Sequence, residues 1–145
     1  MSYIASEFGG QASKKLQDLK FGLEKENDTY DKIKNFLNCG DLNKSSKYGI
    51  IDFYNDTHYI ELKSRRNKYN TFETSIIGKN KIDFFKKLKK ECYIIINFTD
   101  GLYYIKYNED IFNNFEIKNE IIIRDNKKEN KINCHIPIIY LKEII

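Results

Sequence analysis

The stretch IIDFYNDTHYIELKSRR, residues 50–66, places Asp52, Glu61 and Lys63 among isoleucines and other apolar residues. Polar residues 55–57 separate two segments in which apolar and polar side chains alternate, and this pattern predicts a β-hairpin. With the turn at these residues, Asp52 faces Glu61 directly, and such partners hold their Cβ atoms about 4.5–5.5 Å apart. Alternation along the strand puts Lys63 on the same face as Glu61.

These three side chains suit metal-dependent hydrolysis of a phosphodiester. Two carboxylates this close repel each other unless a cation lies between them, and hard oxygen ligands without a nearby His or Cys favour Mg²⁺ or Mn²⁺. A lysine one pleat along the strand can hold an attacking water or offset charge on a phosphoryl group. The opposite face of the hairpin is wholly apolar and is expected to pack on the core through Ile51, Phe53, Ile60 and Leu62.

An ordinary solvent-facing strand is the alternative explanation of the same residues. Strands with one exposed face often alternate apolar and charged side chains, and Asp, Glu and Lys then form surface ion pairs. The charge pattern alone favours neither explanation, so the elements around the hairpin have to decide between them.

A helix before the hairpin supplies a third carboxylate. From Leu16 to Leu37 apolar residues recur at the spacing of a buried stripe, which predicts a helix over residues 14–38. Glu26 occupies the one step of this stripe that is not apolar, and from there it would reach the same metal. Glu24 competes for that role, and only the stripe favours Glu26.

A second helix, predicted over residues 79–91, supplies another lysine. Lys81 shares a helical stripe with Phe84, Phe85 and Leu88, so it is predicted to point inward.

The predicted strands place these helices around one sheet. The strands of the first hairpin cover 49–54 and 58–63, and others follow at 92–98, 102–107, 119–124 and 134–139, with a polar loop at 125–131. This order predicts an α/β fold in which a central mixed sheet of about four or five strands is flanked by helices. The length predicts a single domain, residues 1–145.

The string IDF…IELK, in which Asp52 precedes residues 61–63, resembles the D-x(n)-(D/E)-x-K signature of the PD-(D/E)XK nuclease superfamily. That superfamily has the restriction-endonuclease-like core and includes Holliday junction resolvases and phage nucleases. Its members place a Glu on the helix before the hairpin and often a Lys on the helix after it, which Glu26 and Lys81 match. The resemblance covers about residues 19–98 and is to short phage or large-virus members.

The resemblance implies a role for each residue of the motif. Asp52 and Glu61 would hold Mg²⁺ or Mn²⁺ together with the backbone carbonyl of Leu62, and Glu26 would complete the metal shell. Lys63 would position or activate the water and stabilise the transition state.

The implied activity is that of a metal-dependent endonuclease on nucleic acid, with DNA favoured and branched or junction DNA among the candidates. Lys81 would touch the scissile phosphate or the nucleophile. Arg65, Arg66, Lys68 and Tyr69 follow the hairpin and would bind the substrate by phosphate contacts and base stacking, although a solvated loop explains them equally well.

Composition agrees with this interpretation without requiring it. The net charge of +4 is only weakly basic. Cysteines are three in number and widely spaced, which predicts reduced thiols in an intracellular protein rather than a zinc site or disulfides. No signal peptide or transmembrane segment is predicted, so no membrane association is expected.

Two other functions and the oligomeric state stay open. A nuclease fold that only binds nucleic acid would be expected to lose one of the motif residues, and a structural protein would turn Glu26 and Lys81 to solvent. Cutting a duplex takes two cuts related by a two-fold axis, which favours a homodimer. The apolar segments 119–124 and 136–145 either supply its interface or merely complete the core.

Overall fold

The computed structural model describes residues 16–17, 29–47 and 50–145. Residues 29–37 form a helix. The other elements, in chain order, are β1 (Asn43–Lys47), β2 (Ile50–Tyr54), β3 (His58–Ser64), β4 (Thr74–Gly78), α3 (Lys79–Lys87), β5 (Glu91–Phe98), β6 (Gly101–Lys106), α4 (Glu109–Phe112), β7 (Glu116–Arg124), β8 (Lys127–Pro137), the 3-10 helix η1 (Ile138–Tyr140) and β9 (Lys142–Glu143).

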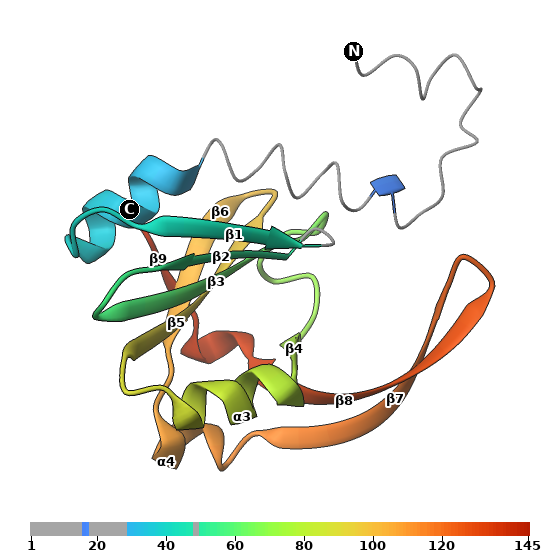
Figure 1. The fold of residues 1–145 in the computed structure, drawn as a ribbon. Coiled ribbons are helices and arrows are strands. Elements are labelled where there is room, and N and C mark those ends of the chain that lie inside the picture. The colour runs from blue at the N-terminus through green and yellow to red at the C-terminus, as the bar shows by residue number, and fades with distance from the viewer. Residues whose placement is uncertain (1–15, 18–28, 48–49) are drawn as a thin grey trace.

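Within the described residues, the strands form two sheets (Figure 1). The larger has the order β1-β2-β3-β5-β6-β9, and the smaller has the order β4-β8-β7. Strands β3 and β5 are parallel, whereas the other neighbours in both sheets are antiparallel. The predicted α/β fold with a mixed sheet is confirmed, and the larger sheet has six strands where four or five were expected.

Both faces of the larger sheet are covered, so its central strands are buried on both sides. The helix at 29–37 lies on one face, where Ile33 packs with Phe53, Ile60 and Leu62 of β2 and β3. On the other face, α3 and the smaller sheet bury Ile94 together with other side chains of β5. Figure 1 shows this arrangement, with the helix at 29–37 above the sheet and α3 below it.

Several element boundaries differ from those predicted. Helix α3 ends at Lys87 instead of residue 91. The polar loop predicted at 125–131 is wrong, because Asp125 and Asn126 form a tight turn with φ of 53° and 64° and β8 begins at Lys127. Short strands β1, β4 and β9 were not predicted. Of the helix predicted over 14–38, the described residues are 16–17 and 29–38, and the helix ends at residue 37.

The hairpin of β7 and β8 reaches beyond the body of the protein (Figure 1). One of its faces carries exposed isoleucines, and Ile121 and Ile123 have exposed fractions of 67% and 66%. Residues 119–124 therefore do not complete the core. Residues 136–145 contribute to it in part, since Ile136 and Leu141 are buried while Ile139 is 82% exposed.

None of the helices in the described part of the chain combines the length and the apolar character of a membrane span.

Candidate active site

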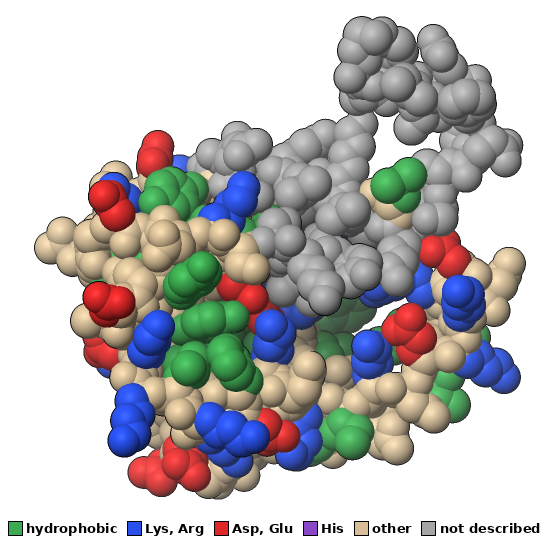
Figure 2. Space-filling view, viewed as in Figure 1, with side chains coloured by type: hydrophobic (Ala, Val, Ile, Leu, Met, Phe, Trp, Pro, Cys, Tyr) green, Lys and Arg blue, Asp and Glu red, His purple; other side chains and the backbone are tan. Residues whose placement is uncertain are grey.

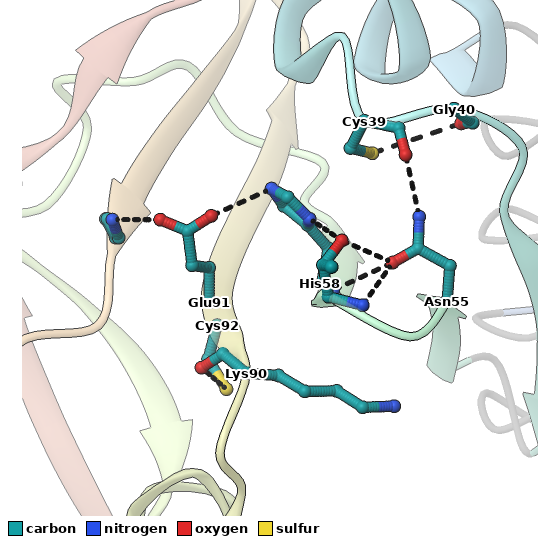
Figure 3. A network of polar contacts seen from close by, with 9 residues as sticks. Cys39, Gly40, Asn55, His58, Lys90, Glu91 and Cys92 are labelled. Atoms are coloured by element: carbon teal, nitrogen blue, oxygen red, sulfur yellow. Dashed lines mark hydrogen bonds and ion pairs between the residues drawn. The ribbon is translucent and has the colours of Figure 1, made fainter.

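The β2–β3 hairpin has the register that the sequence predicts, with Asp52 directly opposite Glu61. Its turn is held by Asn55, whose side-chain oxygen accepts hydrogen bonds from the backbone N–H groups of Thr57 and His58 at 2.9 and 2.8 Å. The amide nitrogen of Asn55 donates to the carbonyl of Cys39 at 2.9 Å, which ties the turn to the segment after the first helix (Figure 3).

A second set of polar contacts fixes the same end of β3 to β5. The Nε2 atom of His58 lies 3.3 Å from an Oε2 of Glu91, and Lys106 donates to the other oxygen of Glu91 at 2.7 Å (Figure 3). His58 lies at the turn end of β3 and serves this network. These contacts at the turn end of the hairpin therefore stabilise the register in which Asp52 lies opposite Glu61.

The acidic face of the hairpin is an interior surface, which excludes the simple solvent-facing strand. Glu61 is fully buried, because β3 lies between β2 and β5 and α3 covers this face. The side chain of Asp52 is 14% exposed. Carboxylates are almost never buried to this extent unless they are paired or bind a metal.

Two lysines reach this carboxylate pair from different elements. The Nζ atom of Lys81, on α3, lies 3.2 Å from Oε1 of Glu61 and 3.7 Å from Oδ2 of Asp52. The Nζ atom of Lys63 lies 3.7 Å from Oε2 of Glu61. Lys81 thus points inward, which argues against the structural alternative that turned it to solvent.

Burial lowers the pKa of Lys63, and the charges of Arg65 and Lys81 act in the same direction while the Glu61 carboxylate opposes them. The charged form of Lys63 is therefore disfavoured in this environment, and the negative charge of a bound phosphate group would stabilise it.

Tyr59 also belongs to this site, although a tyrosine in an apolar strand resembles an ordinary core residue. Its hydroxyl donates a hydrogen bond of 2.8 Å to Oδ2 of Asp52. Burial and this hydrogen bond raise the pKa of Tyr59, so the hydroxyl stays protonated and keeps donating at neutral pH. The signal was in the alternation, because Tyr59 lies one pleat before Glu61 on the same face.

Three buried carboxylate oxygens in the described residues accept no hydrogen bond: Oδ1 of Asp52 and both Oε atoms of Glu61. Buried oxygens in this condition are costly unless a cation satisfies them, and oxygen donors are what Mg²⁺ and Mn²⁺ prefer. The donor set thus fits a hard divalent cation. No group of three or more His, Cys, Asp or Glu side chains converges within the described residues, and Glu26 and Glu24 lie outside them.

The inward stripe predicted for α3 needs correction. Its buried centre is formed by Ile82 and Phe85, whereas Phe84 is 38% exposed and lies edge-on to Tyr59. Lys81 precedes Ile82 and lies at the margin of this buried face, with 24% of its side chain exposed. That position lets its ammonium reach the carboxylates of Asp52 and Glu61.

The loop after β3 brings only part of the predicted nucleic-acid contacts to the surface. Arg66 and Lys68 are exposed, and Arg65 donates to the carbonyl of Ile76 at 3.1 Å. Tyr69 stacks on Tyr103, with centroids 4.1 Å apart, so one face of its ring is already occupied.

Basic side chains are also present elsewhere on this side of the molecule. Figure 2 shows Lys and Arg side chains over α3 and along the β7–β8 hairpin, interspersed with acidic ones. The last turn of α3 contributes Lys86 and Lys87. The surface in this view is mixed in sign, as the small net charge requires.

A mixed sheet with Asp on one strand, Glu-x-Lys on the next and a Lys on the following helix is the arrangement that characterises PD-(D/E)XK nucleases. The family model described as "Phage putative PDDEXK endonuclease" matches residues 19–144, and the chain belongs to this family. Neither the curated proteins nor the solved structures give a significant match. The resemblance seen over residues 19–98 thus extends across β6 to β9.

Proposed function

We propose that the protein is a metal-dependent endonuclease that hydrolyses phosphodiester bonds of DNA. The observation that supports this most is the buried pair of Asp52 and Glu61 in a family of nuclease-type proteins. Three of the pair's oxygens accept no hydrogen bond, and the two that belong to Glu61 lie near the ammonium groups of Lys63 and Lys81. Nucleases of this superfamily generally use divalent metals. Membership of the family therefore leads us to expect a nucleic-acid substrate and a divalent metal.

In this proposal, Asp52, Glu61 and the backbone carbonyl of Leu62 hold Mg²⁺ or Mn²⁺, with Glu26 completing the shell. The metal supplies Lewis-acid activation of water and neutralises charge on the phosphate. Lys63 orients the attacking water and stabilises the charge that develops on the phosphoryl oxygens.

Two further residues position these groups. Lys81 contacts the scissile phosphate, and it is placed to leave the carboxylates for the phosphate because its side chain is partly exposed. Tyr59 holds Asp52 in one orientation through its hydrogen bond. Arg65, Arg66 and Lys68 contact the substrate backbone beyond the site.

The test is cleavage of a panel of linear duplex, branched and single-stranded DNA, and of RNA, with Mg²⁺, with Mn²⁺ and with chelator. Asp52→Asn and Glu61→Gln should each abolish cleavage, because an amide keeps the shape of the side chain but is a much poorer metal ligand. Asp83→Asn is the matched control, since Asp83 pairs with Lys79 on the outer side of α3. Wild-type rates in Asp52→Asn or Glu61→Gln would contradict the assignment.

One observation favours a second function, a nucleic-acid-binding module without catalysis. Lys81 already bridges both carboxylates, and the two ammonium groups of Lys63 and Lys81 balance the two carboxylate charges. A permanent ion cluster of this kind needs no metal. It predicts that Mn²⁺ leaves the thermal stability unchanged, whereas a metal site is stabilised by about 2.7 kcal/mol at a metal concentration of 100 times Kd.

A homodimer is part of the proposal for duplex substrates, because two antiparallel strands then meet two equivalent sites. The exposed isoleucines of the β7–β8 hairpin, Ile121 and Ile123 among them, supply apolar surface for such an interface.

A further inference from the structure

A pocket of about 310 Å³ opens where β3 ends and β4 begins. Its wall combines the rings of Tyr69, Phe72 and Phe98 with the guanidinium of Arg65 and the amide of Asn67. The volume is at the lower end of the range of about 300–1,000 Å³ for small-molecule sites, so the pocket suits a single planar ring system.

The pocket adjoins the proposed catalytic face. Arg65 follows Lys63 by two residues, and its backbone N–H donates to the carbonyl of Asn97 in β5 at 2.9 Å. Its Nη2 atom donates to the carbonyl of Ile76 in β4, the strand that leads directly into α3 and Lys81. When a substrate phosphate lies at Lys63 and Lys81, the base of the adjacent nucleotide is therefore able to reach the pocket.

The inner wall of the pocket is already fixed. The ring of Tyr69 stacks on Tyr103 and meets Phe98 edge-on, and its hydroxyl donates to the carbonyl of Ile138 at 2.8 Å. The backbone N–H of Tyr69 donates to a side-chain oxygen of Asp100 at 2.8 Å. A ligand thus meets an ordered surface, and little conformational entropy is lost when it binds.

Phe72 distinguishes this pocket from a simple gap between elements. Its side chain is 63% exposed although it lines the pocket. A large aromatic ring held in solvent beside an apolar recess offers a stacking face, and stacking of a base on an aromatic side chain tolerates any base.

We propose that this pocket takes an unpaired nucleobase of the substrate, stacked on Phe72, next to the scissile phosphate. The inference rests on the proposed nuclease function and narrows its substrates to nucleic acids with a single-stranded or extrahelical nucleotide at the cut. A base that stays paired in a duplex presents only its edge and does not enter. An apolar side chain of a protein partner would fill the recess but gain nothing from Arg65 and the neighbouring cations, Arg66 and Lys68.

Binding is tested with two DNA duplexes of one sequence, carrying 2-aminopurine either paired or as a single-nucleotide bulge, in chelator so that nothing is cut. The wild type should bind the bulged duplex about tenfold more tightly and change its fluorescence. Phe72→Ala should lose both effects. Phe36→Ala is the matched control, because Phe36 is 39% exposed on the helix at 29–37, which covers the opposite face of the larger sheet. Equal affinities for the two duplexes, or an unchanged preference in Phe72→Ala, would overturn the proposal.

Failure of the pocket and failure of the nuclease assignment give different results. Cleavage that Asp52→Asn abolishes, without any preference for the bulge, would keep the nuclease and remove the pocket. A bulge preference that needs Phe72, without cleavage of any substrate, would keep the base-binding pocket and remove the catalysis. A change in sedimentation of Phe72→Ala without any fluorescence effect would identify a second copy of the chain as the occupant and overturn the proposal.

Discussion

At the scale of single residues, Oδ2 of Asp52 and both oxygens of Glu61 lie near a lysine or the Tyr59 hydroxyl, whereas Oδ1 of Asp52 is buried without a hydrogen bond. Substitutions at these positions change the charge balance of the site. Removing Glu61 altogether would take away the carboxylate that lies 3.7 Å from the ammonium of Lys63, a side chain that is only 18% exposed. Isosteric changes are therefore more informative than changes to alanine, since a truncation mixes loss of function with the cost of an uncompensated charge.

Lys63→Met should separate binding from chemistry. Methionine keeps most of the apolar stem, while the charge that acts on the developing phosphoryl oxygens is lost, so the single-turnover cleavage rate should fall about 10²–10³-fold. Metal affinity should be kept, because Lys63 is not a ligand in this proposal. Lys79→Met is the control, since Lys79 pairs with Asp83 outside the site. Near-normal turnover in Lys63→Met would show that the role assigned to Lys63 is wrong.

Tyr59→Phe should lower the affinity for Mn²⁺ about tenfold, the usual consequence of removing a group that orients a metal ligand. The reason is that Oδ2 of Asp52 loses its donor at 2.8 Å. Titration calorimetry with Mn²⁺ measures the effect. The variant Tyr54→Phe is a useful control, because Tyr54 stacks near Tyr59 but at the other strand of the hairpin. Unchanged affinity in Tyr59→Phe would remove Tyr59 from the site.

At the scale of elements, the turn of the β2–β3 hairpin determines whether Asp52 and Glu61 face each other. A slip by one residue would move every side chain of the strand to the opposite face. Asn55→Ala removes the bonds to Thr57, His58 and Cys39, and it should lower the free energy of unfolding by about 1–2 kcal/mol in urea denaturation. Asp56→Ala, at an exposed position of the same turn, should change it by less than about 0.5 kcal/mol.

The β7–β8 hairpin should respond to acid through Glu120. This carboxylate accepts from Asn133 and contacts His135, and these hydrogen bonds hold its pKa below 4.5. Because the pKa of Glu120 is lower in the folded than in the unfolded protein, its carboxylate stabilises the folded state at pH values above the unfolded-state pKa. This contribution is lost as the pH falls through the folded-state pKa. The protection factors of the β7 amides, which compare measured exchange with the intrinsic rate at the same pH, should therefore fall at acid pH in the wild type, and less so in Glu120→Gln. An equal acid response in both proteins would contradict this.

The elements that the sequence predicted correctly are those with local patterns. Alternation in β2 and β3 gave their register, and the Asp100-Gly101 turn pair gave the β5–β6 hairpin. Strands β1 and β4 were missed because NKSSK and TSIIG have no clear period, and their strand form depends on distant partners. The turn at Asp125 was missed because seven polar residues resemble a loop, although β8 pairs through them.

The site was predictable to the same extent. Asp52, Glu61 and Lys63 followed from strand geometry, and Lys81 was correctly expected to point inward. The sequence pattern of the hairpin predicts neither the complete burial of Glu61 nor the position of Lys81 between the two carboxylates. Both depend on the pairing of β5 with β3 and on the packing of α3 over this face of the sheet. Tyr59 was overlooked because a tyrosine in an apolar strand resembles an ordinary core residue.

At the scale of the whole molecule, the exposed face of the β7–β8 hairpin predicts self-association. Ile121→Lys should shift the protein to the monomer in sedimentation experiments, since a charge at an apolar interface costs desolvation on both copies. The control is Ile139→Lys, a substitution at an exposed isoleucine of η1. A wild-type monomer at working concentration would remove the dimer and favour nicking of single strands.

The parallel pairing of β3 with β5 also bears on the order in which the protein folds. The hairpin with Asp52 and Glu61 is local in sequence and forms quickly, but Lys81 arrives on the crossover through β4 and α3, whose closure is slow. In a chain that is still being synthesised, Asp52 and Glu61 are therefore brought together before Lys81 of α3 reaches them. In refolding experiments, the cleavage activity of the proposed nuclease should return only after α3 has joined the hairpin, so the incomplete site of a folding chain would not cut nucleic acid.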